Sequence, residues 1–253
     1  MTRKRFVVPF LFLFALVWLP GQTQAQDLSQ FWIFTVEPQD IPTFEAAFKA
    51  HVEFRQAQGD PWTWYTHQVA VGEELGTYYV ASWNHTWADF DAYDAWEGGE
   101  AASSHFMATV GPLLKDMSTE ITQSNREMER MPADPMSVNL VNVTTFHVIP
   151  GKQMQFFENM MKFHEAIVEA DLPFYYASDY LVAGGKGPVF SLAGFGERWA
   201  DFADPDPDME EVMTEKYGQE EAMEIFAAFA GSYSHYESFI VRARPDLSGP
   251  GGM

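Results

Sequence analysis

Apolar and polar residues alternate along this chain with two different periods, and the same succession of periods occurs twice. Stretches of period two rich in β-branched and aromatic residues predict strands, and apolar residues three and four positions apart predict helices. In the first half the expected order is a strand (31–36), a helix (43–58), two strands joined by a glycine turn (62–71, 77–83), a helical region from 87 and a strand (118–125). The second half predicts the same order at 141–148, 153–170, 174–183, 189–195, from 199, and 233–241.

Short sequence matches support a tandem duplication. The tetrapeptide Trp87–Phe90 recurs unchanged as Trp199–Phe202, 112 residues later, and an F-x-V-x-P pattern starts at both Phe34 and Phe146 at the same offset. We expect repeat 1 to span residues 26–134 and repeat 2 residues 135–246, with a flexible tail over 247–253.

Each repeat predicts the order β-α-β-β-α-β, which is the ferredoxin-like unit. Such a sheet carries helices on one face only, so its other face must be covered. The predicted fold class is therefore α+β, with two tandem ferredoxin-like repeats packed sheet to sheet as a pseudo-two-fold α/β barrel. The element order, together with Trp83 leading into Trp87–Phe90, resembles the dimeric α/β-barrel superfamily and especially its antibiotic-biosynthesis-monooxygenase-like branch.

The first 25 residues predict a secretory signal peptide. Three basic residues precede an apolar run from Phe6 to Leu19, and Ala25 offers a small residue at the cleavage position. Export would place the protein in the periplasm or outside the cell. The run is interrupted by Pro9 and is short for a membrane span, so we expect no membrane attachment after cleavage.

The amino-acid composition argues against several classes of function. The chain has 253 residues, no Cys, and 15 Lys plus Arg against 36 Asp plus Glu, a formal net charge of −21. This charge argues against nucleic-acid binding, because phosphate recognition needs clustered basic residues. The absence of Cys excludes disulfides, thiolate catalysis and Cys-ligated metals. In a duplicated chain the two repeats can pair with each other, so a second subunit is not needed. This predicts a monomer.

Two histidines are candidate catalytic residues. His67 and Asp179 are equivalent positions on the second strand of each repeat, and Thr35 and His147 are equivalent on the first strand. On the inner face of a two-fold barrel, such positions converge on one cavity, where a histidine could act as a general base. Strand alternation defines two faces but does not decide which is inner, so these side chains could equally meet solvent.

Aromatic residues predict a ligand cavity. Trp62, Trp64 and Tyr65 match Phe174, Tyr175 and Tyr176 in the second repeat, and six of the seven tryptophans after residue 25 lie in repeat 1. A cavity lined by rings with a few polar groups suits a flat apolar molecule. The predicted ligand-binding residues are Trp62, Trp64, Tyr65, Tyr176 and Asp179. The alternative is that the rings simply fill the barrel.

A one-residue insertion would align His51 with His164, both on apolar helix faces, where a hydrogen-bonded core histidine is the expected role. No metal-binding motif is recognisable and no cofactor is predicted. The resemblance implies several activities, among them cofactor-independent oxygenases, isomerases, haem proteins and stress proteins. We therefore expect a small-molecule-binding protein with His67 or His147 as base if it is an enzyme. The alternatives are a non-catalytic binding or stress protein and a haem-binding protein.

Overall fold

The computed structural model describes residues 27–249. The predicted order of elements is confirmed in both repeats. Repeat 1 contains β1 (Leu28–Thr35), α1 (Ile41–Ala57), β2 (Tyr65–Val71), β3 (Thr77–His85), α2 (Trp87–Asp94), α3 (Gly99–Thr109), η1 (Gly111–Leu113), β4 (Asp116–Ser124) and η2 (Arg126–Met128). Repeat 2 contains η3 (Pro135–Ser137), β5 (Leu140–Val148), α4 (Gln153–Glu169), β6 (Tyr176–Ala183), β7 (Val189–Gly196), η4 (Trp199–Phe202), α5 (Met209–Tyr217), α6 (Gln219–Ala230), β8 (Tyr233–Ala243) and η5 (Pro245–Leu247).

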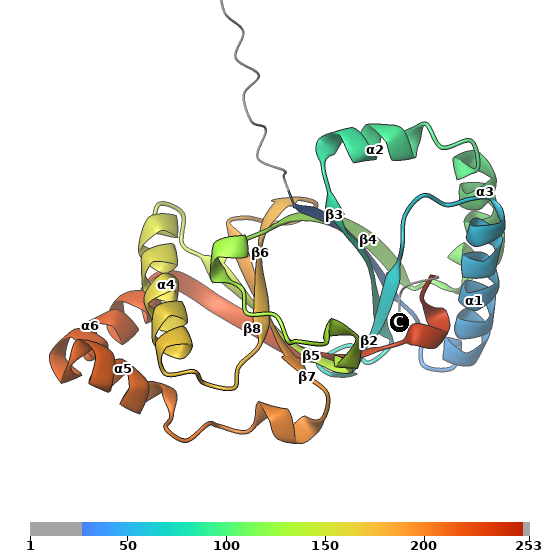
Figure 1. Ribbon diagram of the computed structural model, residues 1–253. Helices are drawn as coiled ribbons and strands as arrows, with labels where there is room; N and C mark the ends of the chain where they lie inside the picture. Colours follow the sequence, from blue (N-terminus) through green and yellow to red (C-terminus); the bar gives the residue numbers. More distant parts are fainter. Residues whose placement is uncertain (1–26, 250–253) are drawn as a thin grey trace, which may run out of the picture.

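The eight strands form one closed antiparallel barrel in the order β1-β3-β2-β8-β5-β7-β6-β4. Within each repeat the strands follow the ferredoxin-like order, and the two repeats join through β2 with β8 and β4 with β6. The helices lie outside the barrel, with α1 to α3 on one side and α4 to α6 on the opposite side (Figure 1). Closure pairs each strand between residues 27 and 249 on both of its edges, so none of these strands leaves an open edge.

Alternation along each strand separates an inner face from an outer face. Val69, Val141 and Val241 come from three strands and pack together with Tyr79 and Phe239 inside the barrel. The outer faces carry the two main cores, where each sheet half packs against its own helices. Their buried members include Phe34, Phe44, Phe48 and Tyr78 in repeat 1 and Phe146, Phe156, Met160 and Phe190 in repeat 2.

The two long helices align without a gap, so the expected one-residue insertion is wrong. Both have 17 residues, and their first residues are 112 positions apart. Phe44 packs against Phe34 and Tyr78, and its true counterpart Phe156 packs against Phe146 and Phe190. His51 therefore corresponds to Phe163 rather than to His164, which corresponds to Val52.

The repeated Trp-Ala-Asp-Phe sequence starts a helical turn. Thr86 caps α2 by accepting from the Asp89 amide, and Asp89 accepts from the Thr86 amide in return, which is a capping box. In repeat 2, Asp201 accepts from the backbone amides of Glu197 and Arg198. In both repeats the aspartate of this sequence therefore accepts backbone hydrogen bonds at the start of a helical turn.

Residues 247–249 are held in place, in contrast to the flexible tail expected from 247. Leu247 is buried, its carbonyl accepts from the Thr66 hydroxyl at 2.8 Å, and the Gly249 amide donates to the Trp64 carbonyl at 2.8 Å. These contacts place residues 247–249 beside the outer face of β2 and the chain just before it. Residues 250–253, like the expected signal peptide over 1–25, lie outside the described residues.

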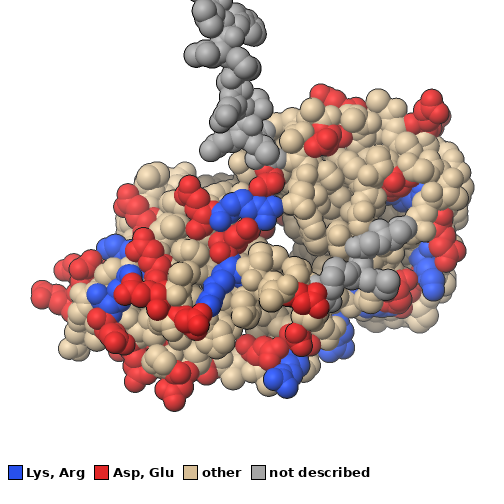
Figure 2. Space-filling model, viewed as in Figure 1, with Lys and Arg blue, Asp and Glu red and all other residues tan. Residues whose placement is uncertain are grey.

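The surface charge is unevenly distributed. In the view of Figure 2, Asp and Glu gather over the helices of repeat 2, whereas the surface over repeat 1 shows wide uncharged areas. Glu220 and Glu221 are exposed on α6. Among residues 27–249, none of the helices is long and apolar enough to cross a membrane.

Candidate functional site

A cavity of about 470 Å³ lies in repeat 1 between the outer face of the sheet and helices α1 and α3. Its floor is formed by β1, β3 and the chain just before β2, and the helices form its walls. Figure 1 shows α1 and α3 standing side by side there, with α2 bridging from β3. The lining includes Trp32, Trp62, Trp64, Tyr93, Trp96 and Phe106 together with His51, Arg55, Asp60 and Ser103.

Stacked rings form one wall of this cavity. Trp62 stacks on Tyr93 with ring centroids 4.1 Å apart and on His85 at 3.8 Å. His85 is held from its other side by a hydrogen bond between its Nε2 and the Ser82 hydroxyl at 2.7 Å. Large flat surfaces that are fixed by their neighbours can bind a flat apolar ligand with little loss of side-chain entropy.

An ion pair lies at one edge of the cavity. Arg55 Nε donates to Asp60 Oδ2 at 2.6 Å, and the Asp60 side chain is only 5% exposed. Asp60 also accepts from Trp64 Nε1 at 3.2 Å and from the Trp62 amide at 3.0 Å. Arg55 lies over the Trp64 ring at 4.9 Å and donates to the Tyr93 hydroxyl. This network fixes the orientation of three aromatic residues that line the cavity.

Two histidines meet where α1 and α3 cross. The Nδ1 atoms of His51 and His105 are 3.2 Å apart, so one ring donates and the other accepts. His51 is 3% exposed and lines the cavity. Burial, followed by the charge of Arg55 and by His105, lowers the pKa of His51 to about 3. The imidazole of His51 is therefore neutral at ordinary pH and available for hydrogen bonding.

His67 and Asp179, the predicted base and its partner, both point into the barrel but do not meet. His67 pairs with Tyr79 and Ala243 on neighbouring strands, and burial lowers its pKa to about 4. Asp179 accepts from the Ser124 hydroxyl at 2.9 Å, and burial raises its pKa. No hydrogen bond or ion pair joins His67 to Asp179 within the described part of the chain. The catalytic role of His67 stays a prediction.

The five predicted ligand residues do not share one cavity, which corrects the expectation of a single site inside the barrel. Trp62 and Trp64 line the cavity on the outer face. Tyr176 also faces outward, where its hydroxyl lies 2.7 Å from His164 Nδ1. Tyr65 and Asp179 face the barrel interior instead, and Tyr65 stacks on Trp83 at 4.3 Å. The aromatic cluster is therefore divided by the sheet itself.

His147, the second predicted base, lies at the end of β5 on the inner face of the barrel. It is the cross-strand partner of His235 on β8 and of Val189 on β7. It contacts neither His67 nor the cavity of repeat 1 in the described structure.

No known family model matches the sequence, and no curated protein is similar enough to match it. Solved structures do match over most of the chain. A putative monooxygenase from Lactobacillus acidophilus NCFM aligns with a TM-score of 0.54 and 8% identity, covering 88% of this chain and 96% of that one. This chain has the dimeric α/β-barrel fold. An anthrone oxidase-like protein aligns with a TM-score of 0.54 at 11% identity (87% and 92% covered). A mutant of chlorite dismutase from Candidatus Nitrospira defluvii aligns with a TM-score of 0.56 at 11% identity (88% and 94% covered).

The two repeats of this α/β barrel differ where the cavity lies. With the ungapped alignment, His51 corresponds to Phe163, Arg55 to Ile167 and Asp60 to Leu172. Ile167 and Leu172 are buried in the apolar core of repeat 2, against which Phe163 also packs. Polar groups thus replace apolar ones at three positions around the cavity of repeat 1. Arg55 and Asp60 are not among the residues predicted from the sequence, although an ungapped alignment of the two repeats pairs them with Ile167 and Leu172.

Buried neutral histidines predict a loss of stability in mild acid. The pKa values of His51 and His67 are near 3 and 4 in the folded chain but about 6.5 when unfolded. Their contribution is fully present above pH about 6.5 and is lost as the pH falls, because only the unfolded chain then takes up the protons. Each histidine can contribute up to ~1.4 kcal/mol per pH unit to this loss.

The variant His51→Phe, which copies Phe163, should therefore show a smaller fall in the free energy of unfolding between pH about 6.5 and 5. Urea unfolding followed by circular dichroism measures this slope. The exposed His235→Phe serves as the control and should retain the full slope. Equal slopes for the wild type and His51→Phe would show that His51 is not buried in its neutral form.

Proposed function

We propose that the cavity of repeat 1 binds a flat, mostly apolar aromatic molecule that carries a hydroxyl or carbonyl group. The observation that carries this proposal is a cavity of about 470 Å³ lined by four tryptophans together with polar side chains such as His51 and Ser103. Packing against the tryptophan rings that line the cavity would hold the ring system, and His51 could exchange a hydrogen bond with the polar group. The replacement of the same polar positions by apolar ones in repeat 2 supports a role for them beyond folding.

We further propose that the bound molecule is oxidised by dioxygen without a resident cofactor. The neutral imidazole of His51 can accept a proton, but its low pKa makes it a weak base. It therefore suits a substrate that is already acidic, such as a phenol or a ring-activated carbon acid. The resemblance to monooxygenase-like structures and to an anthrone oxidase-like protein supports this class of reaction.

Anthrone is a suitable test substrate because it is flat, tricyclic and acidic at its ring carbon. Its oxidation consumes one dioxygen and releases one water as anthrone becomes anthraquinone, so two hydrogens leave the ring carbon and one oxygen atom enters. We expect faster oxygen consumption than with buffer alone, with quinone formation measured by chromatography. His51→Phe should lower the rate while Trp fluorescence quenching by anthrone persists. An isomerase would instead convert its substrate with no change in dissolved oxygen.

A binding protein without catalysis is the second candidate. It is favoured by the contact between the Nδ1 atoms of His51 and His105, which already satisfies one nitrogen of each ring. In this case anthrone would quench tryptophan fluorescence in a saturable manner, but oxygen consumption would equal that of buffer. Failure of both measurements would exclude an anthrone-like ligand altogether.

Haem fits this cavity less well. Of the described residues that line it, Arg55 is the single Lys or Arg, and its charge is already paired with Asp60. Two haem propionates would therefore lack basic partners. We expect that titration with haemin produces no sharp Soret band, and that His51→Ala leaves the spectrum unchanged. A saturable Soret band that is lost in His51→Ala would establish the haem-binding alternative.

Export and a monomeric state are further proposals. The signal-like segment over residues 1–25 supports secretion, and the closed barrel, which pairs all strand edges within one chain, supports a monomer. Expression of the full chain in a secreting bacterial host should yield periplasmic protein beginning near Gln26. Light scattering of that product should give the mass of one chain.

A further inference from the structure

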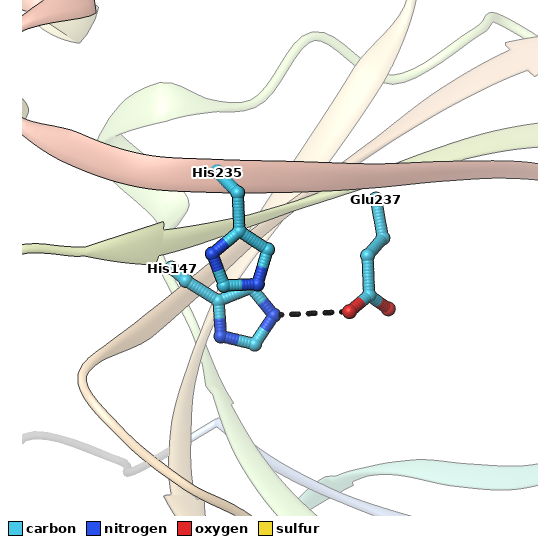
Figure 3. A group of neighbouring side chains, drawn as sticks. All are labelled: His147, His235 and Glu237. Carbon is cyan, nitrogen blue, oxygen red and sulfur yellow. Dashed lines mark ion pairs between the residues drawn. The ribbon is translucent and has the colours of Figure 1, made fainter.

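Three side chains with metal-binding atoms meet at one end of the barrel, away from the cavity of repeat 1. His147 lies at the end of β5, and His235 is its cross-strand partner near the start of β8. Glu237 follows two residues later on β8 and therefore projects from the same face. Figure 3 shows the two imidazole rings one above the other, with the carboxylate of Glu237 pointing toward them.

The distances suit a single metal ion. One ligand atom from each of the three residues lies within 4.8 Å of the other two. His147 Nε2 and Glu237 Oε1 are 3.4 Å apart. Two ligands that bind one tetrahedral ion at about 2.0–2.2 Å are separated by roughly 3.4 Å. The rings are nearly parallel with centroids 4.1 Å apart, so the imidazole of His235 would have to rotate to bring its nitrogen onto the same ion.

The neighbouring Ser234 bears on which ring nitrogen of His235 carries the proton. The Ser234 hydroxyl donates its single proton to the His147 carbonyl at 3.2 Å, and its oxygen lies 3.0 Å from His235 Nδ1. With the hydroxyl proton on that carbonyl, Nδ1 of His235 is the donor in this contact. The lone pair of His235 then resides on Nε2, which is free for a metal. Metal-binding histidines are commonly oriented by such a hydrogen bond from their other nitrogen.

The surroundings are accessible and negative. The side chain of His147 is 29% exposed and that of Glu237 is 64% exposed, so an ion and its water can enter. Burial, with the negative charges of Glu120, Glu237 and Glu74 adding to it, raises the pKa of Tyr79 to about 12. Three carboxylates near this end of the barrel would attract a cation.

The cluster is not a consequence of the fold. The strand pairs β1–β4 and β5–β8 are equivalent, and in repeat 1 the corresponding positions hold Thr35, Asp116 and Ser118. These residues contain no imidazole. The packing of the barrel therefore does not require histidines at this place, and their presence in repeat 2 calls for a separate reason.

We propose that His147, His235 and Glu237 bind one divalent transition-metal ion of the Zn²⁺ class, with water completing its coordination. Two imidazoles and a carboxylate favour zinc, copper or nickel over calcium and magnesium, which prefer oxygen ligands. The site would be independent of the aromatic cavity and would hold its ion open to solvent. Its ligand His147 would then serve the metal rather than act as a free base.

Isothermal titration of the full chain, purified without a histidine tag, tests the proposal with Zn²⁺. We expect one ion per chain, and binding weakened by about tenfold or more in His147→Ala, His235→Ala and Glu237→Gln. Glu224→Gln removes an exposed carboxylate from α6 and serves as the charge-matched control, with unchanged affinity expected. In the wild type, Co²⁺ should show the intense visible absorption of a four-coordinate site.

Zinc binding that is absent in the wild type, or that is equally strong in all three variants, would overturn the proposal. Glu237→Gln is decisive if a histidine variant fails to fold, because Glu237 is exposed and makes no core contact that its amide would lose. Circular dichroism verifies the fold of each variant. None of these measurements involves the cavity of repeat 1, so their outcome is separate from that of the aromatic-ligand assay.

Discussion

Replacing Arg55 with isoleucine should destabilise the protein by about 3 kcal/mol, because it leaves the buried Asp60 carboxylate without its charged partner. Asp60 would keep its hydrogen bonds from Trp64 Nε1 and the Trp62 amide, but these do not neutralise it. For a chain of this size the melting temperature should fall by roughly 6–12 °C. Urea unfolding at neutral pH gives the free energy directly.

The double variant Arg55→Ile with Asp60→Leu should recover much of this loss. It copies the residues of repeat 2, where Ile167 and Leu172 fill the equivalent space. A remaining cost of about 1 kcal/mol is expected because the Trp64 indole loses its acceptor. Lys162→Ile, which breaks an exposed ion pair with Glu221, is the control and should cost less than ~1 kcal/mol. A double variant less stable than Arg55→Ile would contradict the repeat-2 comparison.

The fold could be predicted because its signals are local and occur twice. Alternating residues identified every strand, and the recurring Trp-Ala-Asp-Phe sequence indicated the offset of 112 residues that relates β1–β3 to β5–β7. The helix alignment failed for a physical reason. Phe156 and Phe157 are adjacent and chemically identical, and only packing against Phe146 and Phe190 shows which of them replaces Phe44. Aligning Phe44 with Phe157 shifts the helix by one residue, and Arg55 is then not compared with its counterpart Ile167.

The location of the candidate sites required the structure. Side chains alternate between the two faces of a strand. The residues around Trp64 and Tyr65 are aromatic on both faces, so the sequence does not indicate which face packs against the helices. The metal cluster could not be predicted from sequence spacing. His147 and His235 are 88 residues apart and become neighbours only because β5 pairs with β8. Contacts between distant strands leave no spacing rule in the sequence, unlike the short motifs of helical metal sites.

Replacing Ala102 with phenylalanine should abolish binding of an aromatic ligand while leaving the fold intact. Ala102 is 5% exposed on α3 and lines the cavity of repeat 1. A ring added at this position can enter the existing space, so the cost of overpacking that applies to a filled core is largely avoided. The same ring then occupies the volume that the ligand would need, and an affinity loss of tenfold or more is expected, about 1.4 kcal/mol at least.

Ala101→Phe provides the matched control because it adds the same ring one position away, on an exposed part of α3 that does not line the cavity. Binding is measured by titrating each variant with anthrone and following the quenching of tryptophan fluorescence. Neither substitution adds a tryptophan, so the signals of the two variants can be compared directly. Loss of binding in Ala102→Phe alone places the ligand between the helices and the sheet. Unchanged binding in both variants would exclude this cavity and direct attention to the barrel interior, where His67 and Asp179 lie.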